Sequence, residues 1–227
     1  MILRKWDKLP PEMQIPEVKE YYDILQKRKA SLVLKRLFDI VVSSVLLVLL
    51  SPVFAVLAIA IKLDSKGPVF YRQTRVTRYG EEFRIFKFRS MVTDADKGSL
   101  LTVGGDSRIT KTGKFIRKYK LDEFSQLIDV FRGKMTFVGT RPEVPKYVEK
   151  YTPEMMATLL LPAGITSEAS VYYKDENELL DAAEDIERTY LEVVLPDKMK
   201  YNLAAIRSFS FIDDIKVMIL TVLAVFR

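Results

Sequence analysis

The sequence of 227 residues contains no cysteine and no histidine. Without cysteine the chain can form no disulfide bond, no thiolate nucleophile and no zinc–thiolate site. Without histidine it lacks the side chain that most often serves as a general base near neutral pH. Catalysis by this chain would therefore use carboxylates, Lys, Arg, Tyr, hydroxyl groups or a metal ion with oxygen ligands, and Mg²⁺ suits such a ligand set.

The composition is otherwise that of a chain with a substantial core and an excess of positive charge. Hydrophobic residues make up 48% of the sequence, and the formal net charge is +6. The length fits one domain, or one domain plus an anchor. The charge predicts an anionic partner such as nucleic acid, lipid headgroups or a phosphorylated substrate. The basic residues are not interleaved with stacking aromatics as nucleic-acid binding would require, so we expect no nucleic-acid partner.

One uncharged apolar segment, residues 40–61, is long enough to cross a membrane. As a continuous helix it would measure about 33 Å, and a hydrocarbon core is about 30 Å thick. Ser51 and Pro52 at its centre favour a bend, because Pro52 cannot donate to the carbonyl of Val48 and the Ser51 hydroxyl can bond a freed carbonyl. Both flanks are basic, so the positive-inside rule selects no single orientation. The residues alone leave open a straight span and a bent segment that returns to the same side.

The sequence before and just after this segment predicts an arm, a helix and a small β section. Three prolines in the first 16 residues predict a loose arm, and residues 17–30 predict a basic helix that leads to a membrane surface or is simply solvated. Alternation over residues 83–91 predicts a strand, with a turn at residues 78–81 completing a small hairpin. One face of this strand would carry, in order, Phe83, Ile85, Lys87 and Arg89, so that the two cations at its end would lie side by side.

Helical periodicity returns from residue 110 onward. Gly133 is expected to end the first of these helices, and residues 137–142 and 161–164 are expected to be loops. Further helices are expected over residues 143–157 and 175–192, and over residues 212–226, where the helix would lie in a membrane interface. The first helix is expected to bury an apolar stripe made of Leu121, Phe124, Ile128 and Phe131.

Asp122 and Glu123 lie beside this stripe and are the leading candidates for chemistry. Several cations precede the pair and would keep a carboxylate ionised, and an ionised aspartate can attack phosphorus. A solvated acidic flank is the ordinary alternative. Lys87 and Arg89 could hold phosphate oxygens or form a solvated strand edge. Arg141 lies in a turn, where its neighbours fix it as a better phosphate ligand than an average surface arginine.

Taken together, these segments closely resemble the bacterial sugar transferases, also called monotopic phosphoglycosyl transferases, of the small single-domain type. The resemblance covers roughly residues 32–227. The matching blocks occur in the family's order: Lys35-Arg36-Leu37-Phe38-Asp39, Ser51-Pro52, Gly67-Pro68-Val69-Phe70 with Gln73, Phe86-Lys87-Phe88-Arg89-Ser90-Met91, Asp106-Ser107-Arg108-Ile109-Thr110 with Gly113-Lys114, Leu121-Asp122-Glu123 with Gln126-Leu127, Val138-Gly139-Thr140-Arg141-Pro142, and Gly164-Ile165-Thr166.

The resemblance implies a reaction and a set of roles. A UDP-sugar would give its sugar 1-phosphate to a polyprenyl phosphate such as undecaprenyl phosphate, releasing UMP, in the first membrane step of glycoconjugate or exopolysaccharide synthesis. Asp122 would be the covalent nucleophile, and Glu123 with Asp122 would bind Mg²⁺. The phosphate-binding cations would be Lys87, Arg89, Arg117 and Arg141. Phosphoryl transfer depends mainly on positioning and charge stabilisation, and needs neither cysteine nor histidine.

The resemblance also implies an α+β, mostly helical chain at the cytosolic face of a bacterial inner membrane. Residues 1–31 would form a basic N-terminal arm and helix, residues 32–64 a re-entrant membrane anchor broken at Ser51-Pro52, and residues 65–227 a catalytic domain with a C-terminal interfacial helix. Membrane lipids are expected partners, and a homodimer is left open.

Three departures from the family pattern concern the substrate. Thr140 replaces a usual proline, residues 161–168 differ from the common Pro-Gly-Ile-Thr-Gly, and residues 169–177 lack pieces that many members have. Lys174 is the candidate to replace a later substrate-binding arginine. Two other functions remain as alternatives: a phosphatase or kinase acting on prenyl phosphates, and a basic membrane adaptor without catalytic activity.

Overall fold

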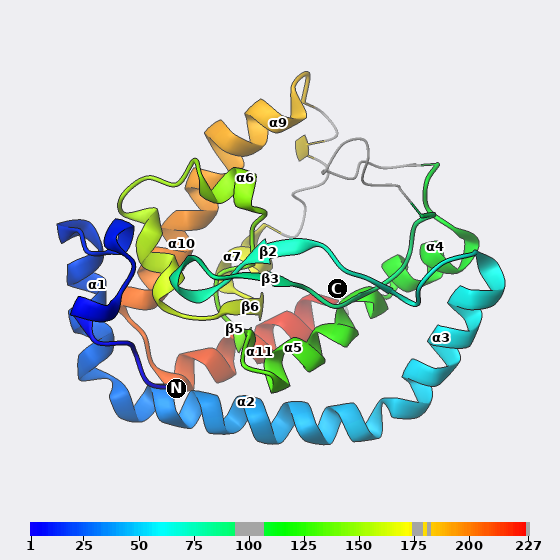
Figure 1. Ribbon diagram of the computed structural model, residues 1–227, viewed down its shortest axis with the longest axis horizontal. Coiled ribbons are helices and arrows are strands. Elements are labelled where there is room, and N and C mark those ends of the chain that lie inside the picture. The colour runs from blue at the N-terminus through cyan, green and yellow to red at the C-terminus, as the bar shows by residue number, and fades with distance from the viewer. Residues whose placement is uncertain (94–106, 174–178, 181–182, 226–227) are drawn as a thin grey trace.

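A computed structural model describes residues 1–93, 107–173, 179–180 and 183–225 (Figure 1). It is mostly helical with small two-stranded sheets, which confirms the predicted α+β class. The helices are α1 Pro16–Lys27, α2 Lys29–Leu49, α3 Ser51–Asp64, α4 Lys111–Lys118, α5 Leu127–Phe131, α6 Pro145–Val148, α7 Glu168–Tyr172, α9 Ile186–Thr189, α10 Leu195–Arg207 and α11 Phe211–Val225, with short 3₁₀ helices η1 Trp6–Lys8, η2 Pro11–Met13, η3 Arg78–Gly80, η5 Leu121–Gln126 and η6 Met155–Leu160 and a π-helical segment η7 Tyr190–Val194. The strands are β1 Phe70–Tyr71, β2 Thr74–Val76, β3 Glu82–Arg84, β4 Lys87–Phe88, β5 Met135–Val138 and β6 Ala163–Thr166.

The apolar segment is broken into two helices at the position that the sequence predicts. Helix α3 begins at Ser51, with Pro52 in its first turn, where a missing N–H costs no hydrogen bond. The Ser51 hydroxyl donates to the carbonyl of Val48 at 2.8 Å, as expected from the sequence. Among the described residues no single helix has both the length and the apolar composition to cross a membrane, whereas α2 and α3 together have both and are bent by 60°.

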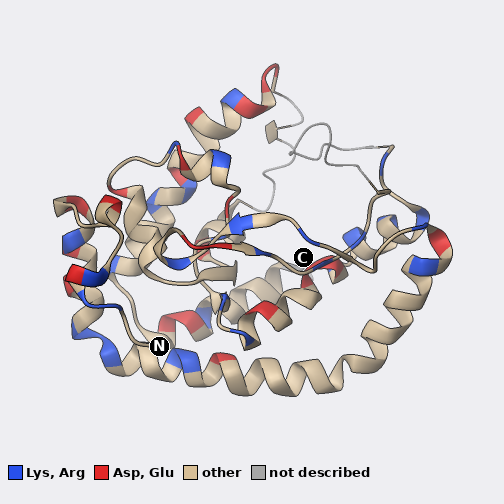
Figure 2. Cartoon of the chain, in the orientation of Figure 1, with Lys and Arg blue, Asp and Glu red and all other residues tan. Residues whose placement is uncertain are grey.

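The helix pair presents two different faces. Figure 2 shows Lys and Arg gathered at its two ends and absent from its middle. On the buried side, α2 packs against α5, α11 and β5. The outward side exposes large apolar side chains, namely Val33, Leu34, Leu37, Ile40, Val41, Val45, Val48 and Leu49 of α2 and Val53, Val56, Ile59 and Leu63 of α3.

Buried polar side chains fix α2 to β5. Asp39 is 1% exposed, and it accepts hydrogen bonds from the Thr136 hydroxyl at 2.8 Å and the Phe137 N–H at 3.2 Å. Lys35, one helical turn earlier, donates to the carbonyl of Val138 at 2.6 Å. These bonds orient the end of β5 and the loop that follows it.

The N-terminal residues are not the loose arm that the prolines suggested. Leu3, Leu9 and Met13 are buried in one core with α1, η6 and α10. The amino group of Met1 donates to the carbonyl of Leu32 at 2.8 Å. Pro11 and Pro16 are the first residues of η2 and α1, a position that suits the fixed φ angle of proline, and Pro10 is the residue that precedes η2. The helix expected over residues 17–30 is confirmed as α1, and its apolar face lies against this core.

The predicted hairpin is present, but the predicted strand is shorter than expected. Strands β2 and β3 pair antiparallel around the turn at Tyr79 and Gly80, which both have positive φ. The strand then ends at Arg84, and the next strand, β4, pairs with β1 and not with β2. Because residues 85–86 interrupt the alternation, one face does not continue from Phe83 to Arg89.

Two segments expected to be loops contribute a parallel strand pair, β5 and β6. Their register joins Met135 to Ala163 and Val138 to Thr166. A Cβ atom on Gly164 would come within 2.2 Å of the Gly139 nitrogen, so the two backbones meet where only glycine fits. The sequence contains too few residues here for a clear period-two pattern, which explains why the strands were missed.

The single helix expected after residue 110 is interrupted, and its apolar stripe is not buried. Lys120 has φ of 52°, which ends α4 and starts the 3₁₀ helix η5. Phe124 and Phe131 are 38% and 48% exposed, whereas Val130 is fully buried. The stripe was predicted from α-helical spacing, and this prediction is wrong because six residues of the segment form a 3₁₀ helix, in which other positions share a face. Gly133, with φ of 78°, follows the end of α5 as predicted.

The later helices match the predictions only in part. Over residues 143–157 the described helices are α6 and the beginning of η6. Residues 175–178 and 181–182 of the range 175–192, with Lys174, lie outside the described residues, and so do Asp106 and Phe226. A continuous helix through α9, η7 and α10 extends well beyond residue 192. The predicted C-terminal helix is confirmed as α11, and its exposed apolar side chains are Ile212, Ile219, Leu220, Val222 and Leu223.

Candidate active site

Asp122 and Glu123 occupy the first turn of η5. The left-handed backbone of Lys120 turns the chain so that η5 leaves the axis of α4, and η5 packs against β4. Both carboxylate side chains are largely enclosed, with 16% and 20% of their surface exposed. The pair is therefore not the solvated acidic flank that the sequence left as an alternative.

Two cations meet this pair from other parts of the chain. The Lys87 ammonium, on β4, lies 3.3 Å from Glu123 Oε1 and 3.9 Å from Asp122 Oδ2. The Arg141 guanidinium, in the loop after β5, donates to Glu123 Oε1 at 2.5 Å. The structure therefore brings together four of the candidate residues, although they are up to 54 positions apart in sequence (141 minus 87).

The two carboxylates have opposite electrostatic environments. Burial would raise the pKa of Glu123, but Arg141 and Lys87 outweigh it and hold that pKa well below its usual value. Burial raises the pKa of Asp122, and Lys87 and Arg117 only partly oppose this. At Asp122 the removal from water has a larger effect on the pKa than the neighbouring cations, although these cations still favour the ionised form that the sequence predicted. Burial also lowers the pKa of Lys87, despite its neighbouring carboxylates.

Arg117 approaches the same carboxylate from α4. Its Nε donates to the Ser90 hydroxyl at 2.9 Å, which fixes the side chain between α4 and the segment after β4. Its positive charge acts on Asp122. Arg117 is therefore on the Asp122 side of the site, while Arg141 is bonded to Glu123.

Arg89 does not join this group. Its guanidinium donates to the carbonyls of Lys66 at 2.8 Å and Ser65 at 2.7 Å, where it closes the end of α3. The expectation that Lys87 and Arg89 lie side by side is wrong, because the two side chains bond opposite partners, the Glu123 carboxylate and the α3 carbonyls. Gly67 lies against Arg89, and a Cβ there would be 2.0 Å from Nη1. This arginine connects the catalytic strand to the broken helix pair.

Sequence reasoning missed a buried polar network behind Arg141. Arg75 donates to the carbonyl of Pro142 at 2.9 Å and to Gln73 Oε1 at 2.7 and 3.0 Å. Glu143 is 6% exposed and accepts from the Tyr190 hydroxyl at 2.5 Å. Of these residues, Gln73 and Pro142 had a signal in the sequence, as parts of family blocks. The network fixes the loop that presents Arg141.

Asp129 holds the strand that carries Lys87. Its carboxylate accepts from the backbone N–H of Phe86 at 2.8 Å. Burial raises the pKa of Asp129 to about 6, although Arg72 and Arg132 oppose the shift. A polar residue amid the apolar pattern of α5 was the available sequence signal.

Asp122 and Glu123 are the residues here that suit a hard cation. Glu123 Oε2 accepts no hydrogen bond from the described residues, and among them the nearest side-chain cation to the Asp122 carboxylate is the Lys87 ammonium, at 3.9 Å. Elsewhere in the described ranges, no group of three or more Asp, Glu, His or Cys residues forms a metal site. Mg²⁺ is commonly held by one or two carboxylates together with substrate phosphates and water, so this pair fits such a shared site.

Comparison with known proteins gives a consistent family assignment. The family model for bacterial sugar transferase matches residues 30–227. The chain is 36% identical over 197 residues to the UDP-glucose:undecaprenyl-phosphate glucose-1-phosphate transferase of Klebsiella pneumoniae, covering 85% of this chain and 40% of that protein. It is 38% identical over 135 residues to the putative undecaprenyl-phosphate N-acetylgalactosaminyl 1-phosphate transferase of Bacillus subtilis, covering 59% and 75% respectively.

A third relative has nearly the same length as the matched region. It is the uncharacterized sugar transferase EpsL of Bacillus subtilis, 31% identical over 192 residues, with 84% of this chain and 86% of that protein covered. Against the first relatives, by contrast, the chain spans about two fifths of their length. The extent of the family match, together with the clustered Lys87, Asp122, Glu123 and Arg141, shows that the chain belongs to the bacterial sugar transferase family.

Proposed function

We propose that this chain transfers a sugar 1-phosphate from a UDP-sugar to a polyprenyl phosphate, for which undecaprenyl phosphate is the natural example. The names of the relatives support the reaction class. The observation that carries it in this chain is the enclosed Asp122-Glu123 pair facing Lys87 and Arg141. Such a site combines a desolvated carboxylate with cations that can balance a diphosphate.

In the proposed first step, an Asp122 carboxylate oxygen attacks the phosphorus that bears the sugar. A bond forms between Asp122 and that phosphorus, the bridging P–O bond breaks, and UMP leaves with the bridging oxygen. Burial favours this attack because a carboxylate removed from water has fewer hydrogen bonds to lose. No proton needs to move, which agrees with a chain that has no histidine.

In the proposed second step, an oxygen of the lipid phosphate attacks the same phosphorus. The aspartyl–phosphorus bond breaks, Asp122 is restored as a carboxylate, and polyprenyl diphosphate sugar is the product. Lys87, Arg117 and Arg141 would neutralise the phosphate oxygens in both steps, since phosphoryl transfer gains most from positioning and electrostatic stabilisation. Arg141 would exchange its bond to Glu123 for one to phosphate.

Mg²⁺ fits the proposal through Glu123 and Asp122. When bound, it would supply additional neutralisation of the diphosphate charge. The positions of the two residues support this, because Glu123 is kept ionised by Arg141 and Lys87. Removal of Mg²⁺ with a chelator should abolish turnover, and re-addition of Mg²⁺ should restore it.

The proposed reaction takes place at a membrane, and we propose that α2 and α3 form a re-entrant anchor at the cytosolic face of a bacterial inner membrane. The 60° bend and the exposed apolar side chains along both helices support this. The exposed apolar face of α11 would lie in the same interface. The site would then meet a soluble nucleotide sugar and a membrane-bound lipid phosphate together.

The chemistry is tested by UMP release in detergent or lipid nanodiscs with undecaprenyl phosphate and Mg²⁺. Asp122→Asn should lose activity by at least about 10³-fold, because a neutral amide is no nucleophile, while Asp7→Asn, at an exposed position, serves as the matched control. Wild-type protein should also exchange labelled UMP into UDP-sugar without lipid. Exchange that required lipid phosphate would refute the covalent step, and phosphate release without nucleotide sugar would favour a phosphatase.

The topology is tested with single cysteines, which the chain allows because it has none of its own. Cysteines replacing the exposed Lys5 and Lys66 should both react with a membrane-impermeant maleimide only from the cytosolic side. A cysteine at Val56, exposed and apolar on α3, should be shielded from both sides. Labelling of the two cysteines, at positions 5 and 66, from opposite sides of the membrane would instead support a straight transmembrane span.

A further inference from the structure

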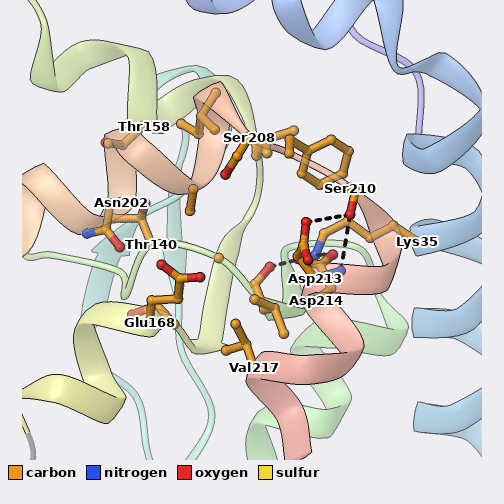
Figure 3. Close-up of a pocket in the computed structure, with 17 residues that line it drawn as sticks. Lys35, Thr140, Thr158, Glu168, Asn202, Ser208, Ser210, Asp213, Asp214 and Val217 are labelled. Carbon is orange, nitrogen blue, oxygen red and sulfur yellow. Dashed lines mark hydrogen bonds and ion pairs between the residues drawn. The ribbon is translucent and has the colours of Figure 1, made fainter. Parts of the chain in front are cut away.

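A cavity is lined in part by the loop that carries Arg141. Its volume is about 50 Å³, and it is enclosed by the loop after β5, the start of α7, and the α10–α11 corner (Figure 3). Gly139 and Thr140 form part of its wall, and Arg141 is the next residue in the chain. The cavity wall therefore adjoins, along the chain, the arginine that donates to the Glu123 carboxylate.

One wall of the cavity has its polar groups already satisfied. The Lys35 ammonium lies 2.6 Å from Asp214 Oδ2 and 2.6 Å from the carbonyl of Val138. The Ser210 hydroxyl donates to Asp213 Oδ2 at 2.6 Å. Figure 3 shows this network together on one side. These groups have little capacity left for a ligand.

The opposite wall carries three polar side chains with unused acceptors. Glu168, Asn202 and Thr140 come from α7, α10 and the loop, and Figure 3 shows them together across from Lys35. Within the described ranges the Glu168 carboxylate and the Thr140 hydroxyl have no hydrogen-bond partner. Asn202 is 7% exposed, and its amide group contacts only Met199 Sγ, at 3.8 Å, so its oxygen is unpaired there.

The Asn202 amide oxygen and the Glu168 carboxylate accept no hydrogen bond from the described residues, so both are free to accept one from a ligand in the cavity. The wall offers mainly acceptors, so it suits a ligand that brings several donors. A hexose ring does so through its hydroxyls or acetamido N–H. Uracil suits it poorly, since it brings two carbonyl oxygens and one N–H. A phosphate is excluded by the carboxylates, because Lys35 is the cavity's cation and is already paired.

The size of the cavity agrees with this ligand. A volume of about 50 Å³ holds roughly three to five water molecules at 10–15 Å³ each. It can therefore take the polar edge of one sugar ring in place of those waters, and a whole nucleotide is too large. Two of the lining residues, Thr140 and Glu168, lie at departures from the family pattern, as expected for residues that set a preference of this chain.

We infer that this cavity binds the sugar ring of the nucleotide sugar, with Glu168, Asn202 and Thr140 accepting its hydrogen bonds, and thereby selects the sugar. The inference rests on the proposed function, with the diphosphate of the same substrate at Lys87 and Arg141. It divides one substrate between two environments, the cationic side of the loop for the phosphates and the acceptor-lined side for the neutral ring.

The test is a panel of UDP-sugars, including UDP-glucose and UDP-N-acetylgalactosamine, assayed by UMP release. Glu168→Gln and Asn202→Ala should each lower kcat/KM for the preferred sugar by about 10- to 100-fold, the usual effect of losing a hydrogen bond to a charged or buried group. The ranking of the sugars should change, and inhibition by UMP should not. Glu149→Gln, on an exposed glutamate, is the matched control and should behave as wild type.

Three results would overturn the inference. Unchanged kinetics would show that the cavity holds no substrate. An equal loss for all sugars with weaker UMP inhibition would place the nucleoside there, and an equal loss with a lower melting temperature would make the residues structural. If Glu168→Gln fails to fold, Thr140→Val, which removes one hydroxyl at constant volume, gives the same comparison. Wild-type protein inactive on every UDP-sugar would instead refute the proposed function, so the two failures are distinguishable.

Discussion

Replacing Lys35 by methionine keeps the length of the side chain and leaves a buried carboxylate without its counter-charge. Lys35 is 3% exposed, and its ammonium lies 2.6 Å from Asp214 Oδ2. Removing one partner of a buried ion pair typically costs about 3–5 kcal/mol, because the remaining charge stays desolvated. For a chain of this length each kcal/mol lowers the melting temperature by about 2–4 °C, so we expect a fall of about 6–20 °C.

The assay is thermal unfolding of the detergent-solubilised protein, measured from pH 5 to pH 8. Burial raises the pKa of Asp214, and Lys35 is the charge that opposes this rise. In Lys35→Met the pKa rises further, so the folded state binds a proton more tightly than the unfolded state. The loss of stability should therefore be small at acid pH, where the carboxyl is neutral, and grow as the pH rises. Lys29→Met, on the exposed part of the same helix, is the control.

A double-mutant cycle separates the pair from the rest of the helix. Asp214→Leu added to Lys35→Met removes both charges and should recover part of the lost stability, since an apolar pair of similar volume is often as stable as a buried ion pair. The reasoning is refuted if Lys35→Met costs no more than Lys29→Met at pH 8, or if the double variant shows the sum of the two single losses.

Three further changes test the surroundings of the site. Asp129→Asn should stabilise the protein at pH 8 by about 3 kcal/mol relative to its effect at pH 4, because an acid with a folded pKa of about 6 instead of 3.8 is penalised only when ionised; a gain independent of pH, in thermal unfolding, would contradict this. Gly67→Ala should cost about 1–3 kcal/mol more than Gly80→Ala, since both have positive φ but only Gly67 lies against the Arg89 guanidinium; equal losses in thermal unfolding would count against that contact. Arg141→Lys should lower kcat/KM for UMP release by about 10- to 100-fold because lysine lacks the planar fork, and activity close to wild type would show that Arg141 needs only its charge.

Part of the fold follows from local rules that the sequence carries. The break at Ser51-Pro52 is local. Pro52 has no N–H to donate to the carbonyl of Val48, and the Ser51 hydroxyl donates to that carbonyl instead. The positions of α1, α11 and the β2–β3 hairpin follow from periodicity and turn residues. The Asp122-Glu123, Lys87 and Arg141 candidates were found because their chemical types and order are distinctive.

What only the tertiary structure decided is which of these side chains meet. Lys87 and Arg89 are two positions apart, yet one contacts Glu123 and the other the carbonyls at the end of α3, because the elements that pack around β4 come from different parts of the chain. The pKa of Asp122 is set by burial, which depends on segments distant in sequence. By itself the sequence determined where the apolar helix pair α2–α3 breaks, because that break depends on the neighbouring residues Ser51 and Pro52. The cavity at Glu168 and Asn202, by contrast, exists only because α7 and α10 pack together in the folded chain.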